Sequence, residues 1–244
     1  MARTLQDRPD LSSAFQSRGV TGCFALYDAR NDAVTTVGGA RATTRFVPAS
    51  TFKIANSLIA LETGAVRDEN EVIPTGPGPY AIKAWERQMG MREAIVVSHV
   101  PAYQLLARRI GLDAYRTWLA RLDFGNRETG TVVDRFWLDG PLAISAVESA
   151  IFAARLGRGE LNASARAQAL VRDILKIETR DGATLYAKTG WASPGPPAIG
   201  WWTGWVERAG AVHGFSLNID MPDIAGAPKR PEISRAILSA LQVY

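Results

Sequence analysis

The segment that decides the fold of this chain is Phe46-Val47-Pro48-Ala49-Ser50-Thr51-Phe52-Lys53-Ile54-Ala55-Asn56-Ser57-Leu58. Proline and small residues favour a loop at its start, and the apolar residues after them favour a buried helix that ends near Gly64. Residues three apart on a helix share one face, so Ser50 and Lys53 are predicted to point the same way. A serine hydroxyl becomes a nucleophile when a base takes its proton. Ser50 is therefore the candidate nucleophile and Lys53 its candidate base.

An S-x-x-K pair fixes only two positions, and such pairs arise by chance in many chains of this length. Ser50 is nevertheless the only serine of the sequence with a lysine three residues further on. It also stands at a predicted helix start, where free N–H groups and about half a positive charge suit the oxyanion of an acyl-transfer reaction. The assignment of Ser50 and Lys53 as a catalytic pair is strengthened only if other parts of the chain carry residues suited to the same acyl-transfer reaction.

Length and composition indicate one globular domain spanning residues 1–244. The sequence is 47% hydrophobic and 21% charged, as in an ordinary soluble protein. The net charge is +4, but the longest basic clusters are pairs such as Arg108-Arg109 and Lys229-Arg230. Scattered basic residues argue against a nucleic-acid partner.

The sequence also argues against membrane, disulfide and metal chemistry. No segment approaches the roughly 18 apolar residues of a membrane span, and the polar start of the chain lacks the apolar region of a signal peptide. The single cysteine, Cys23, has no partner for an intrachain disulfide and is predicted to be a buried strand residue. With two isolated histidines and no cluster of ligands, no metal is expected.

Strand patterns occupy both ends of the chain and helix patterns its middle. The sheet part is predicted at about residues 1–47 and 180–244, with strands at 23–27, 34–37, 184–188, 200–207 and 212–220. The helical part is predicted at about 48–179, with helices after that of Ser50 at 91–97, 101–111, 112–122, 145–156 and 165–175. A last helix, at 231–241, has apolar residues spaced to cover the sheet.

Two further motifs accompany the S-x-x-K pair. Ser98-His99-Val100 lies at a predicted turn in the helical part, and Lys188-Thr189-Gly190 ends a late strand. A lysine, a hydroxyl and a close backbone approach at a strand edge suit an anionic acyl substrate. The order S-x-x-K, S-x-x, K-T-G is that of the serine penicillin-recognising enzymes.

Over nearly its whole length the chain resembles the class D, oxacillinase-type β-lactamases. The S-x-V form of its second motif is typical of class D, whereas class A has S-D-N. The resemblance implies an α+β fold in which an antiparallel sheet with flanking helices adjoins an all-helical region, with the active site in the cleft between them. It is carried by Pro48-Ala-Ser-Thr-Phe-Lys53, Ser98-His-Val100, Phe124-Gly-Asn126, Phe136-Trp-Leu138, Tyr186-Ala-Lys-Thr-Gly190 and Gly200-Trp-Trp-Thr-Gly-Trp-Val-Glu207.

The same resemblance implies that Ser50 forms an acyl-enzyme and that Lys53 carries CO2 as an N-carboxylated lysine, the general base of both half-reactions. No other cofactor is implied. A lysine with its ordinary pKa of about 10.4 is almost entirely protonated at neutral pH, so burial has to lower this pKa before the amine can bind CO2. Val100 and Trp137 are among the groups that the family places around the lysine, and the indole N–H of Trp137 can donate to the carbamate.

The remaining roles concern the substrate. The resemblance implies an oxyanion hole built from the backbone N–H groups of Ser50 and Trp191, and a proton relay through Ser98 to the leaving nitrogen. It implies that the β-lactam carboxylate is held by Lys188, Thr189 and Gly190 of the strand together with Arg230. A solvated arginine is the alternative for Arg230, although a guanidinium matches a carboxylate best.

Three other functions share part of these sequence features. A β-lactam-sensing domain shares the fold and is acylated without turnover, but sensors usually carry a polar residue in place of Val100 and follow membrane helices. A cell-wall peptidase favours S-x-N. A Ser-His-Asp triad would require His99 or His213 near the nucleophile, and we expect His99 to point away from it. We expect a small-molecule β-lactam as the partner, a monomer or homodimer, and a periplasmic or secreted location.

Overall fold

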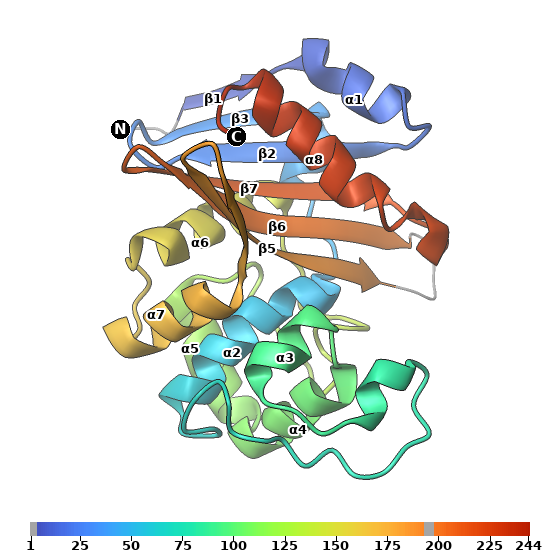
Figure 1. Cartoon of the computed structure of the whole chain (residues 1–244), viewed down its shortest axis with the longest axis vertical. Coiled ribbons are helices and arrows are strands. Elements are labelled where there is room, and N and C mark those ends of the chain that lie inside the picture. Colours follow the sequence, from blue (N-terminus) through green and yellow to red (C-terminus); the bar gives the residue numbers. More distant parts are fainter. Residues whose placement is uncertain (1–3, 193–197) are drawn as a thin grey trace.

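The computed structural model describes residues 4–192 and 198–244, which form a sheet at one end of the molecule and a group of helices at the other (Figure 1). The sheet has seven strands in the order β1-β3-β2-β7-β6-β5-β4. The strands are β1 (Thr4–Asp7), β2 (Gly22–Asp28), β3 (Ala33–Val37), β4 (Lys176–Arg180), β5 (Ala183–Ala192), β6 (Ile199–Arg208) and β7 (Ala211–Asp220). The prediction that the two ends of the chain build one sheet is confirmed, because β2 pairs with β7.

Tight hairpins join the strands that the sequence predicted as neighbours. β6 and β7 are connected at Ala209 and Gly210, whose φ angles of 49° and 74° are those of a turn that matches the twist of the strands. β2 and β3 are connected around Asp32, with a φ of 47°. Every pairing in the sheet is antiparallel except that of β1 with β3, which is parallel. The sheet is therefore mixed: it is antiparallel, as predicted, except for this one pairing at its edge.

The two edge strands, β1 and β4, were missed from sequence. All four residues of β1 are exposed, and β4 carries no buried residue, so neither shows the alternation of apolar and polar residues that marks a half-buried strand. β4 also follows a helix directly, without a turn of glycine or proline. The C-terminal portion of the sheet therefore begins at Lys176 rather than near residue 180.

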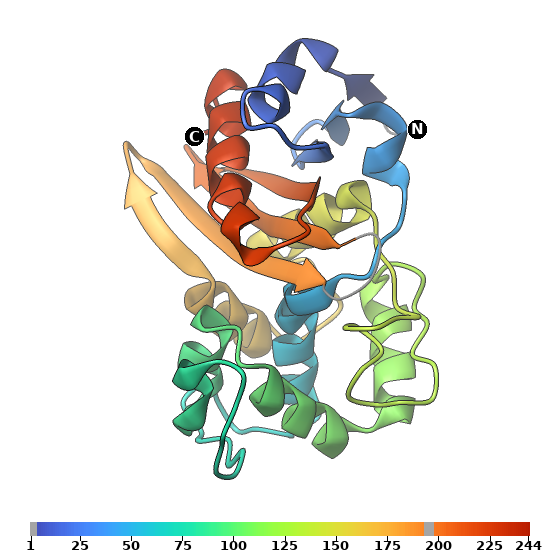
Figure 2. The ribbon, with the colours of Figure 1, turned by 90° about the vertical axis from the view of Figure 1, so that its right-hand side faces the viewer.

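Helices cover both faces of the sheet (Figures 1 and 2). α1 (Ser13–Gln16) and α8 (Lys229–Ala240) lie on one face, where Ile233, Ile237 and other apolar residues pack against the strands. α6 (Ala146–Arg158) lies on the other face and begins with the capping box predicted at Ser145. Two apolar layers thus enclose the sheet.

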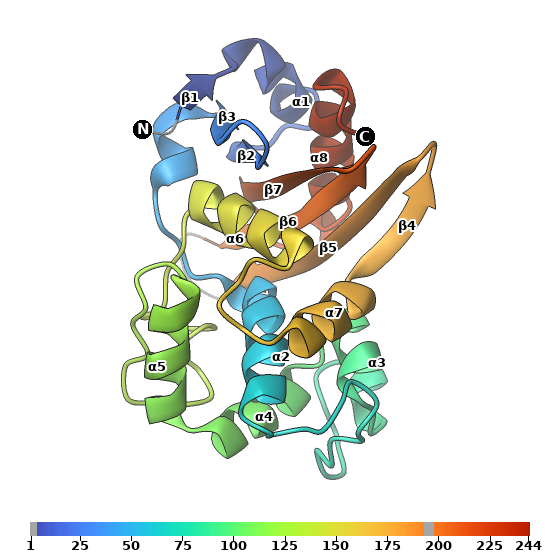
Figure 3. The same ribbon diagram turned by 90° about the vertical axis from the view of Figure 1, so that its left-hand side faces the viewer.

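The helical part is built around one central helix, α2 (Lys53–Glu62), as Figure 3 shows. All of its residues from Lys53 to Leu61 are buried. Its neighbours are α3 (Met91–Val96), α4 (Val100–Ile110), α5 (Leu112–Leu122) and α7 (Ala165–Ile174). Short 3-10 helices complete the described chain: η1 (Pro9–Ser12), η2 (Gly39–Thr43), η3 (Ala49–Phe52), η4 (Lys83–Glu86) and η5 (Ile224–Gly226). Among the described residues no helix has the length and apolar character needed to span a membrane.

The contact between α6 and β7 depends on a residue without a side chain. A Cβ placed on Gly214 would lie 2.0 Å from the carbonyl oxygen of Ala150 and 2.8 Å from the Cβ of Ala154. The nearest of these atoms belongs to the helix backbone, which cannot move aside as a flexible side chain can. The helix therefore lies directly on the strand.

We expect Gly214→Ala to lower the free energy of unfolding by about 3 kcal/mol or more, because the added methyl group must push α6 away from the sheet. Denaturant unfolding measures this loss, with Ser239→Ala, at an exposed position of α8, as the control. A Gly214→Ala variant as stable as the control variant would contradict the close packing of α6 on β7.

Candidate active site

Ser50 and Lys53 lie on one face of a helix start, as their spacing predicts. Ser50 belongs to η3, and the α-helix begins only at Lys53, one turn later than predicted. The turn before the serine is constrained, since Ala49 adopts a φ of 49°, which is uncommon for a residue other than glycine. The Nζ atom of Lys53 donates a hydrogen bond of 2.8 Å to the Oγ atom of Ser50. The candidate nucleophile and its candidate base are therefore in direct contact.

Lys53 is fully buried, and this controls its proton affinity. Burial lowers the pKa of its amine well below the ordinary value, and the nearby charge of Lys188 lowers this pKa further. The amine lies 5.2 Å from the centre of the Tyr103 ring. No carboxylate among the described residues forms an ion pair with Lys53. Both effects disfavour the ammonium form and so favour the neutral amine that a base requires.

Two tyrosines that were missed from sequence form hydrogen bonds with polar residues one turn further along α2, although the side-chain nitrogen of Asn56 keeps no partner among the described residues. The hydroxyl of Tyr103 lies 2.8 Å from the Ser57 hydroxyl, and that of Tyr115 donates to the side-chain oxygen of Asn56 at 2.8 Å. Lys53 is three and four residues before Asn56 and Ser57, so the polar side chains form one stripe along a buried helix. The spacing of these three residues indicates that they need polar partners, but it does not identify Tyr103 and Tyr115 as those partners.

The Ser98 turn meets the end of β5. Ser98 lies between α3 and α4 with a φ of 54°, and its hydroxyl accepts a 2.6 Å hydrogen bond from the amine of Lys188. The same amine donates to the carbonyl oxygen of Thr189 at 2.9 Å and contacts the Thr189 hydroxyl at 3.2 Å. Burial, together with the charge of Arg230, lowers the pKa of Lys188 to about 7. The second and third sequence motifs are therefore joined by a hydrogen bond.

Gly190 and Arg230 complete this edge of the sheet. A Cβ on Gly190 would lie 3.1 Å from the carbonyl oxygen of Pro48, so the strand passes directly beside η3. The Nη1 atom of Arg230 donates to the carbonyl oxygen of Gly190 at 2.7 Å, and its Nε atom donates to that of Ala227 at 3.1 Å. Arg230 is only 8% exposed, and burial lowers its pKa to about 10. A solvated arginine is therefore excluded.

Trp137 is fully buried, and its indole nitrogen has no hydrogen-bond partner among the described residues. Its ring packs on Phe52, the residue before Lys53, with 5.5 Å between the ring centres. Phe136 packs on the same indole at 5.0 Å. A buried N–H donor without a partner is costly, so this one indicates a place for an acceptor that the protein itself does not supply.

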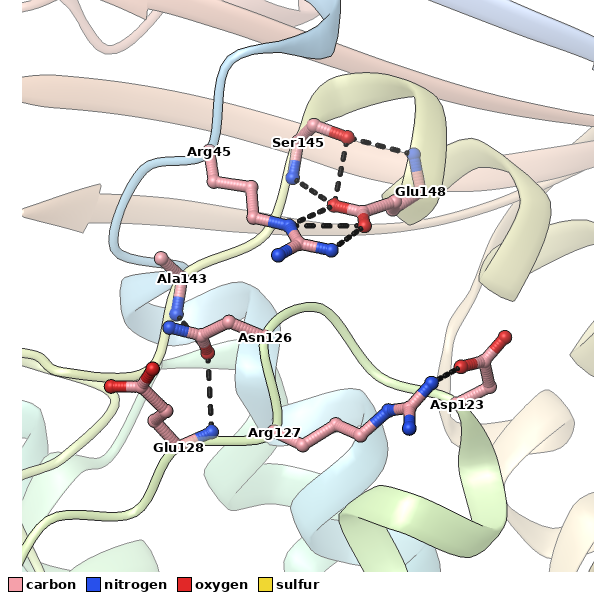
Figure 4. A network of polar contacts seen from close by, with 8 residues as sticks. All are labelled: Arg45, Asp123, Asn126, Arg127, Glu128, Ala143, Ser145 and Glu148. Carbon is pink, nitrogen blue, oxygen red and sulfur yellow. Dashed lines mark hydrogen bonds and ion pairs between the residues drawn. The ribbon is translucent and has the colours of Figure 1, made fainter.

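A network around Asn126 ties down the segment that carries Trp137 (Figure 4). The side-chain oxygen of Asn126 accepts from the backbone N–H groups of Ala143 and Glu128 at 3.0 and 3.2 Å, and its side-chain nitrogen donates to the Pro141 carbonyl at 2.8 Å. Both ends of residues 126–143 are thereby pinned to each other. This gives the Phe124-Gly125-Asn126 motif a structural role that its sequence did not reveal.

The same close-up shows how the segment before the nucleophile is attached to α6. Arg45 forms an ion pair with Glu148, and Glu148 in turn accepts hydrogen bonds from the backbone N–H and the hydroxyl of Ser145. Phe46 continues the attachment, because its N–H and C=O groups exchange hydrogen bonds with those of Ile144 at 3.0 and 2.9 Å. The indole N–H of Trp201 on β6 donates to the Val47 carbonyl at 2.9 Å, so the segment before the nucleophile turn is held by the start of α6 and by the sheet.

The other predicted site residues lie on the same elements. Val100 is the first residue of α4 and is half-buried, and Thr189 is half-buried on β5. Trp191 follows on β5, and its indole N–H donates to the Met221 carbonyl at 2.9 Å. Trp201, Trp202 and Trp205 are buried in the core, as expected.

Three basic side chains, those of Lys53, Lys188 and Arg230, are thus buried in series without an acidic partner among the described residues. The charge of Lys188 acts on the pKa of Lys53, and that of Arg230 acts on the pKa of Lys188. None of the three forms an ion pair with any residue that the structure describes. Beside a neutralised Ser50–Lys53 pair, such a row suits an anionic substrate that undergoes acyl transfer.

Comparison with known proteins agrees with this arrangement. The model of the penicillin-binding protein transpeptidase domain matches residues 22–239. β-Lactamase OXA-5 of Pseudomonas aeruginosa is 36% identical over 98% of this chain and 91% of its own, and OXA-48 of Klebsiella pneumoniae is 36% identical over 98% and 90%. The crystal structure of FUS-1 (OXA-85), a class D β-lactamase from Fusobacterium nucleatum subsp. polymorphum, superposes with a TM-score of 0.93 at 37% identity, covering 98% of this chain and 99% of that one.

This chain belongs to the class D β-lactamases. The fold and the family implied by the sequence motifs are therefore confirmed.

In this class D β-lactamase the middle residue of S-x-V is a buried histidine. His99 was expected to point away from the nucleophile, and it makes no hydrogen bond with Ser50 among the described residues. It is nevertheless fully buried, and its Nδ1 atom accepts from the N–H of Ala102 at 3.2 Å, which makes it the N-cap of α4. His213 is half-buried on β7. Neither histidine forms a triad with Ser50 in the described chain.

The lowered pKa of Lys188 in this class D β-lactamase makes stability depend on pH. Its pKa is about 7 in the folded protein, against 10.5 ordinarily, so the unfolded chain binds more protons between these values. The contribution of Lys188 to the free energy of unfolding therefore rises with pH from about 7 to 10. We expect Lys188→Met to reduce this rise by about 1 kcal/mol per pH unit, as measured by denaturant unfolding at pH 7, 8 and 9. Lys176→Met, at an exposed lysine, is the control, and equal slopes in the two variants would contradict the assignment.

Proposed function

We propose that this protein hydrolyses the β-lactam ring of penicillin-type antibiotics through an acyl-enzyme on Ser50. The observation that carries the proposal is the direct contact of Ser50 with a buried lysine, beside two further buried basic side chains that lack an acidic partner among the described residues. The names of the relatives, all β-lactamases, support the same substrate class. As in the sequence-based expectation, we infer that the enzyme acts in the periplasm or outside the cell.

Acylation begins when Lys53, or the group that it carries, takes the proton of the Ser50 hydroxyl. The 2.8 Å contact between the two side chains is already at hydrogen-bond distance. The nucleophile then attacks the β-lactam carbonyl, and the leaving ring nitrogen needs a proton. Ser98 can supply it, because its hydroxyl lies 2.6 Å from the Lys188 amine, from which it can be reprotonated.

The oxyanion that forms on attack requires N–H donors, and we assign these to the backbone of Ser50 and Trp191. Support comes from the close approach of β5 to η3 at Gly190, where an added Cβ would lie 3.2 Å from the Thr51 nitrogen. Strand and nucleophile turn are thus near enough to share one carbonyl oxygen. Donors fixed in advance stabilise the transition state without reorganisation.

The β-lactam carboxylate is assigned to Lys188, Thr189 and Arg230. The hydroxyl of Thr189 already faces the Lys188 amine, and two of the five donor N–H groups of Arg230 are used on backbone carbonyls. The protein therefore holds the guanidinium in place, and its other N–H groups remain available to a substrate carboxylate. A carboxylate would supply the missing negative charge, and Gly190, which has no side chain, lets this end of the strand lie directly beside the nucleophile turn.

A carbamate on Lys53, formed from CO2, fits the residues around it. The fully buried amine has the lowered pKa that CO2 addition requires, and Trp137 offers a buried N–H donor without a partner. Half-buried Val100 at the start of α4 would help to exclude water from the same place. When present, the carbamate would supply a carboxylate-type base that could take the Ser50 proton and activate water.

Steady-state hydrolysis of a penicillin, oxacillin, a cephalosporin and a carbapenem tests the proposed function. Sustained ring opening of the penicillin is the expected result. A burst of ring opening equal to the protein concentration, with no turnover afterwards, would instead assign the chain to the β-lactam-sensing proteins.

We expect Ser50→Ala to abolish turnover while the protein remains folded. The change removes one hydroxyl group from a helix start, so Tm should stay close to that of the wild type. Mass spectrometry of both proteins after exposure to penicillin should show a covalent adduct on the wild type alone. An adduct on the Ser50→Ala variant would remove Ser50 from the role of nucleophile.

The carbamate makes activity depend on both pH and bicarbonate. Because the pKa of Lys53 is lowered, its free amine persists to lower pH than that of an ordinary lysine and becomes protonated as the pH falls through that lowered value. Protonation prevents CO2 from binding, so the rate should fall on the acid side and bicarbonate should restore much of it. Trp137→Ala should deepen the dependence on bicarbonate, since it removes a donor and admits water. The chelator EDTA should have no effect.

Initial rates of penicillin opening from pH 5 to 8, with and without bicarbonate, measure this dependence in both proteins. Carbon-13 NMR with labelled bicarbonate provides a readout that needs no substrate, because a carbamate on Lys53 gives its own signal. Coincident rates across the range together with no carbamate signal would show that Lys53 acts as a plain amine.

A further inference from the structure

The side chain of His99 determines where helix α4 begins. Its Nδ1 atom accepts the 3.2 Å hydrogen bond from the Ala102 N–H, which lies in the first turn of α4 and has no partner within the helix. The backbone N–H of His99 donates to the Ala94 carbonyl of α3 at 2.8 Å. One residue thus joins the end of α3 to the start of α4, and Ser98 is the residue directly before it.

An aromatic pair holds the imidazole from the other side. The ring of Trp85 stacks on that of His99 with 5.8 Å between centres and 21° between planes, and Tyr80 packs edge-on at 6.1 Å. The indole N–H of Trp85 also donates to the Val97 carbonyl at 3.0 Å. The segment that contains Tyr80 and Trp85 therefore braces both flanks of Ser98.

Ser98 itself needs such support. Its φ of 54° is uncommon for a residue other than glycine and persists only where the surroundings impose it. The Ser98 N–H donates to the Ile95 carbonyl over 3.3 Å, and its hydroxyl accepts from Lys188. The hydroxyl must stay near both the lysine and the substrate, so a small displacement of this turn would be costly.

We propose that His99 is a positioning residue for Ser98: as the N-cap of α4, stacked on Trp85, it holds the Ser98 hydroxyl in reach of Lys188 and of the leaving nitrogen. The assignment rests on the proposed hydrolase function for its kinetic consequence. His99 makes no hydrogen bond with Ser50 or Ser98 among the described residues, so it acts through backbone geometry and transfers no proton to either.

The cap requires a neutral ring. Nδ1 accepts a hydrogen bond and so carries no proton, which places the proton on Nε2. Burial lowers the pKa of His99 and favours this neutral form. A serine or asparagine could cap the helix as well, but the histidine ring adds the stack on Trp85.

Three variants test the proposal. His99→Ala removes the cap, His99→Asn returns a side-chain acceptor, and Ser164→Ala removes a comparable cap elsewhere, since the Ser164 hydroxyl accepts from the Ala167 N–H at 3.1 Å at the start of α7. Penicillin hydrolysis is measured with excess bicarbonate, so that loss of the Lys53 carbamate cannot be the cause of a slower rate. Hydrogen exchange of the Ser98 amide is measured in parallel without substrate.

We expect both alanine variants to lower Tm, but only His99→Ala to lower kcat, by about 10- to 100-fold with KM nearly unchanged, and to speed exchange at Ser98. His99→Asn should recover most of kcat and the slow exchange. If His99→Ala lowers Tm but leaves kcat and Ser98 exchange at the values of Ser164→Ala, His99 is a structural cap only and the proposal is wrong. If His99→Asn is as slow as His99→Ala, the cap is not what positions Ser98. A wild type that does not open penicillin would refute the hydrolase function, and the exchange data would still decide the role of His99.

Discussion

The rest of the structure depends on the burial of one amine. Lys53 can act as a base only when water is kept from it, because desolvation is the main cause of its lowered pKa. A helix that starts at such a residue cannot lie on a surface. α2 is buried from Lys53 to Leu61, and the surrounding helices pack against it and keep water away. The polar side chains that follow on the same stripe, Asn56 and Ser57, are then buried too and require the hydroxyls of Tyr115 and Tyr103.

The same constraint extends to Lys188 and Arg230. Burying cations without acidic partners destabilises a protein, and each of the two has a lowered pKa for this reason. The protein compensates in part with backbone carbonyls, which accept from Lys188 at Thr189 and from Arg230 at Gly190 and Ala227. A carboxylate-bearing substrate would complete the compensation. The free energy lost by burying these cations is already spent when the protein folds. Binding of a carboxylate-bearing substrate can therefore recover part of it.

Local patterns in the sequence predicted the elements that carry a buried face. Five strands, the central helices and the Ser50–Lys53 contact follow from periodicity and spacing, which act over a few residues. β1 and β4 were missed because they bury nothing, and their pairing is decided by neighbouring strands. The 3-10 turn that contains Ser50 is likewise imposed from outside, through the constrained Ala49 and the attachment of Phe46 to Ile144.

Contacts between distant residues were predicted only through the conjunction of motifs. Ser98 and Lys188 are 90 residues apart, and no local rule pairs them. His99 shows the limit of motif reasoning, because the middle position of S-x-V is variable. The burial of His99 against Trp85 depends on the short 3-10 helix η4, which no sequence pattern predicted.

Gly190 illustrates how the site constrains both parts of the fold at once. As a strand residue it is unfavourable, since glycine weakens strands and packs nothing. Its place follows from the nucleophile turn, because any Cβ at this position would lie 3.1 Å from both the Pro48 carbonyl oxygen and the Thr51 side chain. The missing side chain lets the edge of β5 approach η3, and the Gly190 carbonyl is then free to accept from Arg230. The nucleophile comes from the helical part, Lys188 from strand β5 and Arg230 from helix α8, so the site forms only when these distant parts of the chain have folded together.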